Sequence, residues 1–259
     1  MRWFDAGVNL FSPQFAGQEA QIVADAQAAG IAGLLLISSE LTESQLNLSF
    51  CQQHPACYAS AGVHPHQAAQ VEKDWLAKLQ SLLGRPQIVA IGECGLDFNR
   101  DFSPRTTQQQ IFAEQLQLAS QYNKAVYLHE RDAFPTQIAM LREQPVSRGI
   151  AHCFTGDLAQ LKVYLDLGLY IGITGWLCDE RRGQALQQAV AYIPEDRLIL
   201  ETDAPYLVPR TIRPRPKRNT PALLPAIAAE VARLTGRDLT TLAAQTFTNS
   251  CRLFQLQET

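Results

Sequence analysis

Histidines and carboxylic acids occur at the places in the sequence where short apolar runs end. Six residues share this position: His64, His66, Glu93, His129, His152 and Asp203. Neutral imidazole and carboxylate are common protein ligands of divalent cations. A bound cation lowers the pKa of water and so supports hydrolysis. The pattern therefore predicts a functional cluster for metal-assisted hydrolysis.

The apolar runs alternate with longer amphipathic segments along the chain. We expect strands at residues 3–10, 33–38, 58–63, 88–92, 125–129, 149–153, 169–173 and 198–202. Helices are expected over residues 18–29, 108–122, 158–167 and 221–234, among others. Strands separated by helices predict βαβ units and a parallel sheet.

The predicted fold class is α/β, as a (β/α)8 TIM-type barrel that forms a single domain over residues 1–259. Eight strands give about 32 residues for each strand–helix unit, close to the spacing in barrels of about 250 residues. The rival is a doubly wound open sheet, which normally has a Gly-rich phosphate loop after its first strand. Residues 5–12 form no such loop, and this favours the barrel.

Barrel enzymes carry their chemistry at the carboxyl ends of the strands, where all six residues are expected. Glu93 is flanked by Gly92 and Gly95, and small neighbours let the backbone come close to an ion or a substrate. Asp203 precedes an Ala-Pro pair, a rigid corner that would fix its direction. It is expected to bind metal, to take the proton of the attacking water, or both.

A nucleophilic mechanism is less favoured by the sequence. No Gly-x-Ser-x-Gly motif occurs. Cys94 and Cys153 directly follow Glu93 and His152, so on regular strands they would point to the opposite face. We therefore expect both thiols in the barrel wall and outside the functional cluster.

Four segments resemble motifs of the TatD family of metal-dependent deoxyribonucleases. They are residues 62–66 (GVHPH), 92–97 (GECGLD), 152–156 (HCFTG) and 201–207 (ETDAPYL). The resemblance implies a TIM-type barrel of the metallo-dependent hydrolase superfamily. It also implies hydrolysis of DNA phosphodiester bonds as a 3′→5′ exonuclease. We expect single strands or frayed ends as the substrate, with RNA as a further candidate and DNA repair as the setting.

The same resemblance implies roles for individual residues. Glu93 would be a bridging metal ligand and catalytic residue, and Asp203 would be the catalytic aspartate and a ligand. His129 and His152 would bind the same metal. His64 would contact substrate or metal, and we place His66 with it among the substrate-binding residues.

The chain departs from the family pattern at the end of the first strand. Most members carry His-x-His there, whereas the matching positions are Gly7 and Asn9. Asn9 is then the candidate ligand of a second site, together with Glu93 and Asp203. Oxygen ligands suit Mg²⁺, whereas imidazoles suit Mn²⁺ or Zn²⁺. We expect one or two divalent ions, with Mg²⁺ as the first choice.

A basic segment follows Asp203 and suits a polyanion. Residues 210–218 hold five basic residues and no acid: Arg210, Arg213, Arg215, Lys217 and Arg218. Basic groups hold phosphates, and Arg131, two residues after His129, would reach the scissile phosphate from another side. The alternative is a solvated loop whose charges pair with surface acids.

Aromatic residues near the same rim are candidates for stacking on bases of a single strand. They are Phe98, Phe154, Trp176 and Tyr206. Packing in the protein is an equally good explanation for each of them. No base-reading motif is present, so recognition should be of backbone and strand end.

Composition limits the other classes of function. The net charge is −3, no apolar run reaches 18 residues, and the N-terminus carries Asp5 where a signal peptide needs apolar residues. We expect a cytoplasmic monomer without membrane contact. Two alternatives stay open: an amidohydrolase or esterase for a small substrate, and a non-catalytic nucleic-acid-binding barrel.

Overall fold

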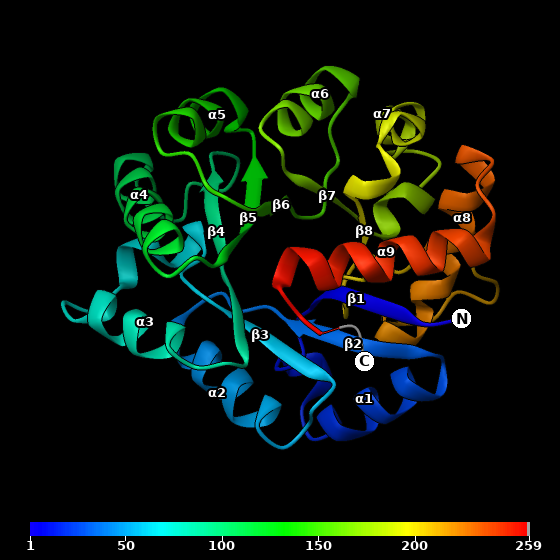
Figure 1. Cartoon of the computed structure of the whole chain (residues 1–259), viewed down its shortest axis with the longest axis horizontal. Coiled ribbons are helices and arrows are strands. Elements are labelled where there is room, and N and C mark those ends of the chain that lie inside the picture. Colours follow the sequence, from blue (N-terminus) through cyan, green and yellow to red (C-terminus); the bar gives the residue numbers. More distant parts are fainter. Residues whose placement is uncertain (258–259) are drawn as a thin grey trace. The chain divides into compact units, whose positions relative to one another are not determined.

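The computed structural model describes residues 1–257, and over this range eight strands alternate with helices (Figure 1). The strands are β1 (Trp3–Val8), β2 (Ile31–Leu36), β3 (Cys57–Ala61), β4 (Ile88–Asp97), β5 (Ala125–Arg131), β6 (Gly149–Ala151), β7 (Tyr170–Ile173) and β8 (Leu198–Leu200). Each overlaps a strand range expected from the sequence. Nearly all strand residues are buried, as expected for parallel strands covered on both faces.

Helices follow the strands. The α-helices are α1 (Glu19–Ala28), α2 (Leu41–Cys51), α3 (Trp75–Leu83), α4 (Arg105–Gln121), α5 (Phe134–Glu143), α6 (Leu158–Asp166), α7 (Gln184–Ala189), α8 (Leu224–Thr235) and α9 (Leu239–Phe254). The four helix ranges expected from the sequence are confirmed. Local signals fix several ends: Asp157 and Gln160 form a capping box at α6, and Gly236 ends α8 with a φ of 72°.

Contacts divide the chain into two compact units. One comprises residues 1–35 and the chain from Cys153 onward, and the other comprises Leu36–His152. The prediction of one domain over residues 1–259 stays a prediction. In the described part of the chain, no helix is long and apolar enough to span a membrane.

The unit Leu36–His152 contains β3, β4, β5 and β6, which pair in parallel in this order. Helix α4 packs against β4 and β5 (Figure 1). The pairing of β4 with β5 is irregular between Ile91 and Cys94, where β4 has one residue more than its partner. Such a bulge re-aims the strand, and Glu93 lies within it.

Beyond the bulge, β4 pairs with β5 as far as Asp97 opposite Arg131, five residues past the strand end expected from the sequence. Gly95 has a φ of 138°, and a Cβ atom there would lie 2.0 Å from the carbonyl oxygen of His129. Glycine is therefore required for the close approach of β4 to β5. Gly92 serves the same approach, since its Cβ would lie 2.4 Å from the oxygen of Tyr127.

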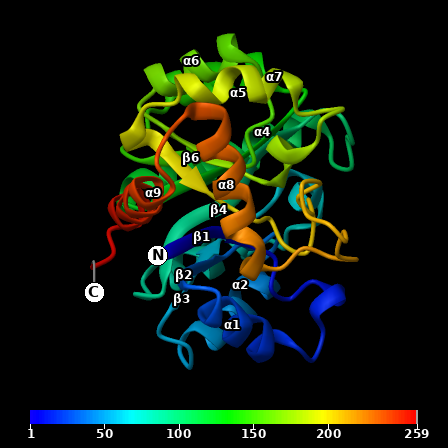
Figure 2. The ribbon, with the colours of Figure 1, turned by 90° about the vertical axis from the view of Figure 1, so that its right-hand side faces the viewer.

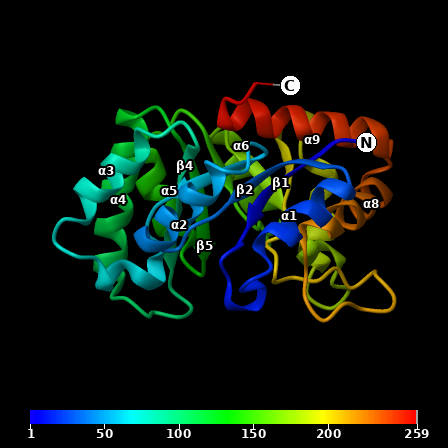
Figure 3. The same cartoon turned by 90° about the horizontal axis from the view of Figure 1, so that it is seen from below.

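The other unit contains β1, β7 and β8. Strands β7 and β8 pair in parallel, and a bridge from Val8 to Ala204 joins the end of β1 to the segment after β8. Helix α8 packs on α9 and β1 (Figure 2), and α9 also packs against β1, near the N-terminus in Figure 3. The bridge brings the segment after Val8 next to Asp203.

Candidate metal centre

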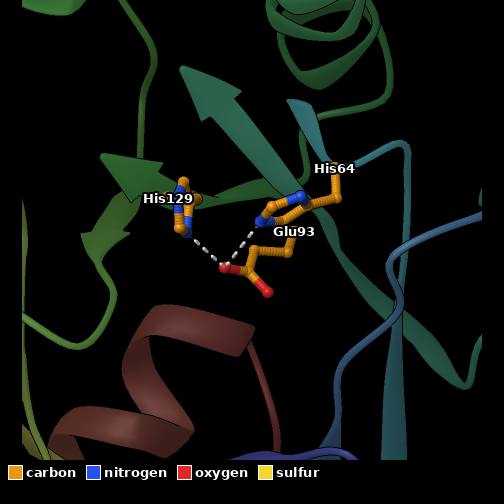
Figure 4. Close-up of side chains that lie close together, drawn as sticks. All are labelled: His64, Glu93 and His129. Carbon is orange, nitrogen blue, oxygen red and sulfur yellow. Dashed lines mark hydrogen bonds and ion pairs between the residues drawn. The ribbon is translucent and has the colours of Figure 1, made fainter. Parts of the chain in front are cut away.

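One carboxylate oxygen is the centre of the histidine cluster in Leu36–His152. Oε1 of Glu93 lies 2.8 Å from Nδ1 of His129, 3.6 Å from Nε2 of His64 and 3.9 Å from Nε2 of His152. Figure 4 shows His64 and His129 directed at this carboxylate from either side. Glu93 lies within β4, His129 lies in β5, and His64 follows β3. The ligand atoms of these three residues all lie within 4.8 Å of one another. Of the six residues expected to share a site, Glu93, His64, His129 and His152 come together here.

The charge of Glu93 is stabilised by its neighbours. Burial opposes ionisation, but the attraction of His64 and the hydrogen bond of His129 outweigh it, and the pKa of the Glu93 carboxyl lies well below its usual value. A buried, ionised carboxylate among imidazoles is a ready ligand for a divalent cation. The donor set therefore fits such an ion.

His129 lies between two carboxylates. Its Nδ1 contacts Glu93, and its Nε2 lies 3.3 Å from Oδ2 of Asp97. Burial alone would lower the pKa of His129, but hydrogen bonds to Asp97 and Glu93 raise it to about 9. The ring is thus fixed in direction by contacts at both nitrogens.

Asp97 is a functional neighbour that the sequence reasoning did not single out. It is 1% exposed, and its Oδ2 also lies 2.7 Å from Nε2 of His66. Its Oδ1 accepts hydrogen bonds from the backbone N–H groups of Asn99 and Arg100. Asp97 belongs to the GECGLD motif and lies four residues after Glu93, so both residues are on one strand. This was the sequence feature that could have identified it.

His152 is held by a second residue that the sequence reasoning missed. The hydroxyl of Tyr127, fully buried in β5, lies 2.7 Å from Nδ1 of His152. This contact orients the ring so that Nε2 faces Glu93. Partners of this kind fix the tautomer and direction of metal-binding histidines.

In the other unit, Asp203 is fixed by the end of β1. Its backbone N–H donates to the oxygen of Gly7, and its φ is 55°. The amide Nδ2 of Asn9 donates to Oδ1 of Asp203 over 2.9 Å and contacts the oxygen of Ala204. Asn9 therefore contacts the catalytic candidate directly, and its role as a second-site ligand stays a prediction.

The expected position of Cys153 is wrong. Its φ of 44° interrupts the alternation of strand side chains, and its Sγ lies within 4.8 Å of a carboxylate oxygen of Asp203. The thiol therefore lies beside a candidate site residue instead of in the barrel wall. Cys94, by contrast, is fully buried as expected.

The basic residues expected to bind phosphate differ in whether they are exposed or bonded to other side chains of the protein. Arg131 ends β5 and is exposed. Arg210 instead forms a pair of 3.1 Å hydrogen bonds to the carboxylate of Glu180 and lies near Asp179. Arg218 donates to Gln18. Much of the basic segment is thus engaged with the protein itself, as the solvated-loop alternative expects.

Comparison with known proteins gives one family over most of the chain. Residues 4–255 match the family described as TatD related DNase. The "3′-5′ ssDNA/RNA exonuclease TatD" of Erwinia tasmaniensis is 48% identical over 258 residues, which cover 98% of this chain and 100% of the relative. The protein of the same name from Edwardsiella piscicida is 48% identical and covers 97% and 99%.

Solved structures agree on the fold. YjjV, a TatD homologue from Escherichia coli K12, matches with a TM-score of 0.91 at 28% identity over 99% of both chains. An organophosphorus hydrolase mutant from Deinococcus radiodurans matches with a TM-score of 0.66 at 15% identity, over 97% of this chain and 92% of that one. The predicted (β/α)8 TIM-type barrel is thereby confirmed, and the doubly wound sheet is excluded.

Proposed function

We propose that this chain, which belongs to the family of TatD-related DNases, is a metal-dependent 3′→5′ exonuclease for single-stranded DNA. The family expected from the four sequence motifs is thus confirmed. The convergence of three imidazoles on Oε1 of Glu93 is the observation that carries the proposal. RNA is included as a second substrate of the same chemistry, because the curated relatives are named for both.

We further propose that the cofactor is Mg²⁺, with Mn²⁺ or Zn²⁺ as alternatives, in one or two ions. Glu93, His129 and His152 would hold it, with Asp203 and Asn9 as the remaining candidate ligands. When bound, a divalent cation there would favour ionisation of water and offset negative charge on the phosphate.

The chain's own residues supply the other steps of the proposal. Asp203 accepts the proton of the attacking water, a role that suits a carboxylate fixed by Asn9. Arg131 donates hydrogen bonds to the phosphate oxygens, which gain charge as water attacks. His64 and His66 contact the substrate beside them. Arg210 has this role only after it leaves Glu180.

The test uses a 5′-labelled single-stranded oligonucleotide with Mg²⁺ or Mn²⁺, read as a ladder on a denaturing gel. The proposal predicts stepwise shortening from the 3′ end, inhibition by EDTA, and protection by phosphorothioate linkages at the 3′ end alone. Glu93→Gln and Asp203→Asn should each lower the rate more than about 100-fold.

His54→Gln is the matched control, since His54 lies outside the cluster and stacks on Phe50. It should cut DNA at the wild-type rate. If the wild type leaves DNA and RNA intact but hydrolyses an ester or lactone panel, the small-substrate alternative replaces this proposal. Binding of DNA without any cleavage would instead favour the non-catalytic barrel.

Several narrower expectations accompany the proposal as predictions. They are a single working domain, a monomer, a cytoplasmic location and a role in DNA repair. Size-exclusion chromatography with light scattering tests the monomer, and survival of a deletion strain after DNA damage tests the role in repair.

A further inference from the structure

An exposed phenylalanine lies beside the histidine cluster and is not used by the chemistry above. Phe102 is 66% exposed, and its ring centroid lies 4.8 Å from that of His66 in an edge-on arrangement. The His66 ring is in turn 4.3 Å from that of His64. Phe102 is therefore separated from His64 by the ring of His66 alone.

The loop that carries Phe102 is fixed by hydrogen bonds at its neighbour. Ser103 is fully buried, its hydroxyl donates to the oxygen of His66, and it accepts from the N–H of Ala69. The side chain of Gln108 also donates to the oxygen of Ser103. The backbone next to Phe102 is thus tied to the segment that begins at His66, and the ring is presented to solvent from a fixed position.

Basic residues occur close to Phe102 in the chain and at the neighbouring strand end. The exposed residues Arg100 and Arg131 lie on the same loop and on the adjoining strand end, where Phe98 donates its N–H to the oxygen of Arg131. Proteins that bind single strands combine aromatic rings, on which bases stack, with basic groups that hold the phosphates.

We propose that Phe102 is a specificity-determining residue that stacks on an unpaired base of the bound strand. The inference rests on the proposed function and deepens it, because a paired base in a duplex does not offer its face to such a ring. Phe102 would therefore favour single strands over duplexes.

The test is a double-mutant cycle that combines removal of the Phe102 ring with removal of single bases. Binding is measured by fluorescence anisotropy in EDTA, so that no strand is cut. The oligonucleotides carry one abasic position at a time near the 3′ end. Phe102→Ala should weaken binding of the intact strand by about 5- to 150-fold, the range for loss of one base–aromatic stack. At one position, removing the base should weaken binding by the wild type as much as Phe102→Ala weakens binding of the intact strand. The same removal should leave binding by Phe102→Ala unchanged.

Further variants separate stacking from general apolar contact. Phe102→Trp should restore affinity, whereas Phe102→Leu should not. Tyr192→Ala removes another exposed aromatic, 61% exposed in the other unit, and should bind like the wild type. The inference is overturned if Phe102→Ala binds as the wild type does, or if every abasic position weakens both proteins equally. A wild type that cuts DNA while Phe102→Ala keeps full affinity refutes this inference alone, whereas a wild type that neither binds nor cuts refutes the proposed function as well.

Discussion

The backbone N–H of His66 donates a hydrogen bond to Nδ1 of His64 over 3.1 Å. An N–H donor needs a lone pair on Nδ1, so the proton of neutral His64 is on Nε2. Burial, with the repulsion of His129, lowers the pKa of His64 to about 4, and the ring is neutral at pH 7. Its Nε2 then directs an N–H toward Glu93 instead of offering a lone pair to a cation.

This relationship predicts different effects for two histidines of one cluster. We expect His64→Ala to weaken Mn²⁺ binding about tenfold, the effect of losing an outer partner of a ligand. His129→Ala should weaken it more than about 100-fold, because a ligand itself is lost. Calorimetric titration of Mn²⁺ into each variant measures both effects, and equal losses would contradict the tautomer assignment.

Tyr127 provides a second test of how the cluster is oriented. Tyr127→Phe removes the hydroxyl that contacts Nδ1 of His152 and keeps the ring. We expect Mn²⁺ affinity to fall about 10- to 100-fold while the circular dichroism spectrum stays that of the wild type. Tyr122→Phe, in the same unit, is the control and should bind Mn²⁺ normally. Unchanged affinity in Tyr127→Phe would show that His152 needs no such support.

Gly95 tests the close approach of β4 to β5. Gly95→Ala places a Cβ 2.0 Å from the oxygen of His129 at a φ of 138°, so both the contact and the backbone are strained. We expect the free energy of unfolding to fall by more than about 3 kcal/mol in urea denaturation. Gly84→Ala, where the nearest atom would be 3.9 Å away, should change it by less than about 1 kcal/mol. Similar values for the two variants would contradict the proposed packing.

Asp5 predicts a pH dependence of stability. Burial raises the pKa of its carboxyl to about 7, although Thr202 donates two hydrogen bonds to it. The folded state thus holds the proton more tightly than the unfolded chain. The contribution of the protonated Asp5 carboxyl to the free energy of unfolding is complete below about pH 4 and is lost as the pH rises to about 7.

The measurement compares the wild type with Asp5→Asn, which cannot titrate, in urea unfolding without divalent metal. Between pH 5 and pH 8 the wild type should lose about 2–3 kcal/mol more than the variant. Parallel pH profiles of the two proteins would show that the pKa of Asp5 is not raised in the folded state.

The strand positions could be predicted because buried parallel strands are short apolar runs between helical segments. The histidine cluster followed from the rule that such strands share one functional end. The extension of β4 to Asp97 could not be predicted from the sequence, because it depends on a bulge and on two glycines that allow contact with β5.

Other features depend on tertiary contacts with no local signature. Tyr127 appears in the sequence as an ordinary strand aromatic, and its contact with His152 spans 25 residues. The misplacement of Cys153 arose because strand alternation was extended past Ala151, where β6 ends. The pairing of Arg210 with Glu180 likewise depends on where a loop folds back.

The most direct test of the central claim is the Mn²⁺ dependence of single-strand cleavage in wild type and Glu93→Gln, measured with Mn²⁺ binding by electron paramagnetic resonance on the same samples. The account predicts that the wild type binds Mn²⁺ and shortens the strand, and that Glu93→Gln loses both by more than about 100-fold. A Glu93→Gln protein that binds Mn²⁺ and cuts DNA as well as the wild type would contradict it.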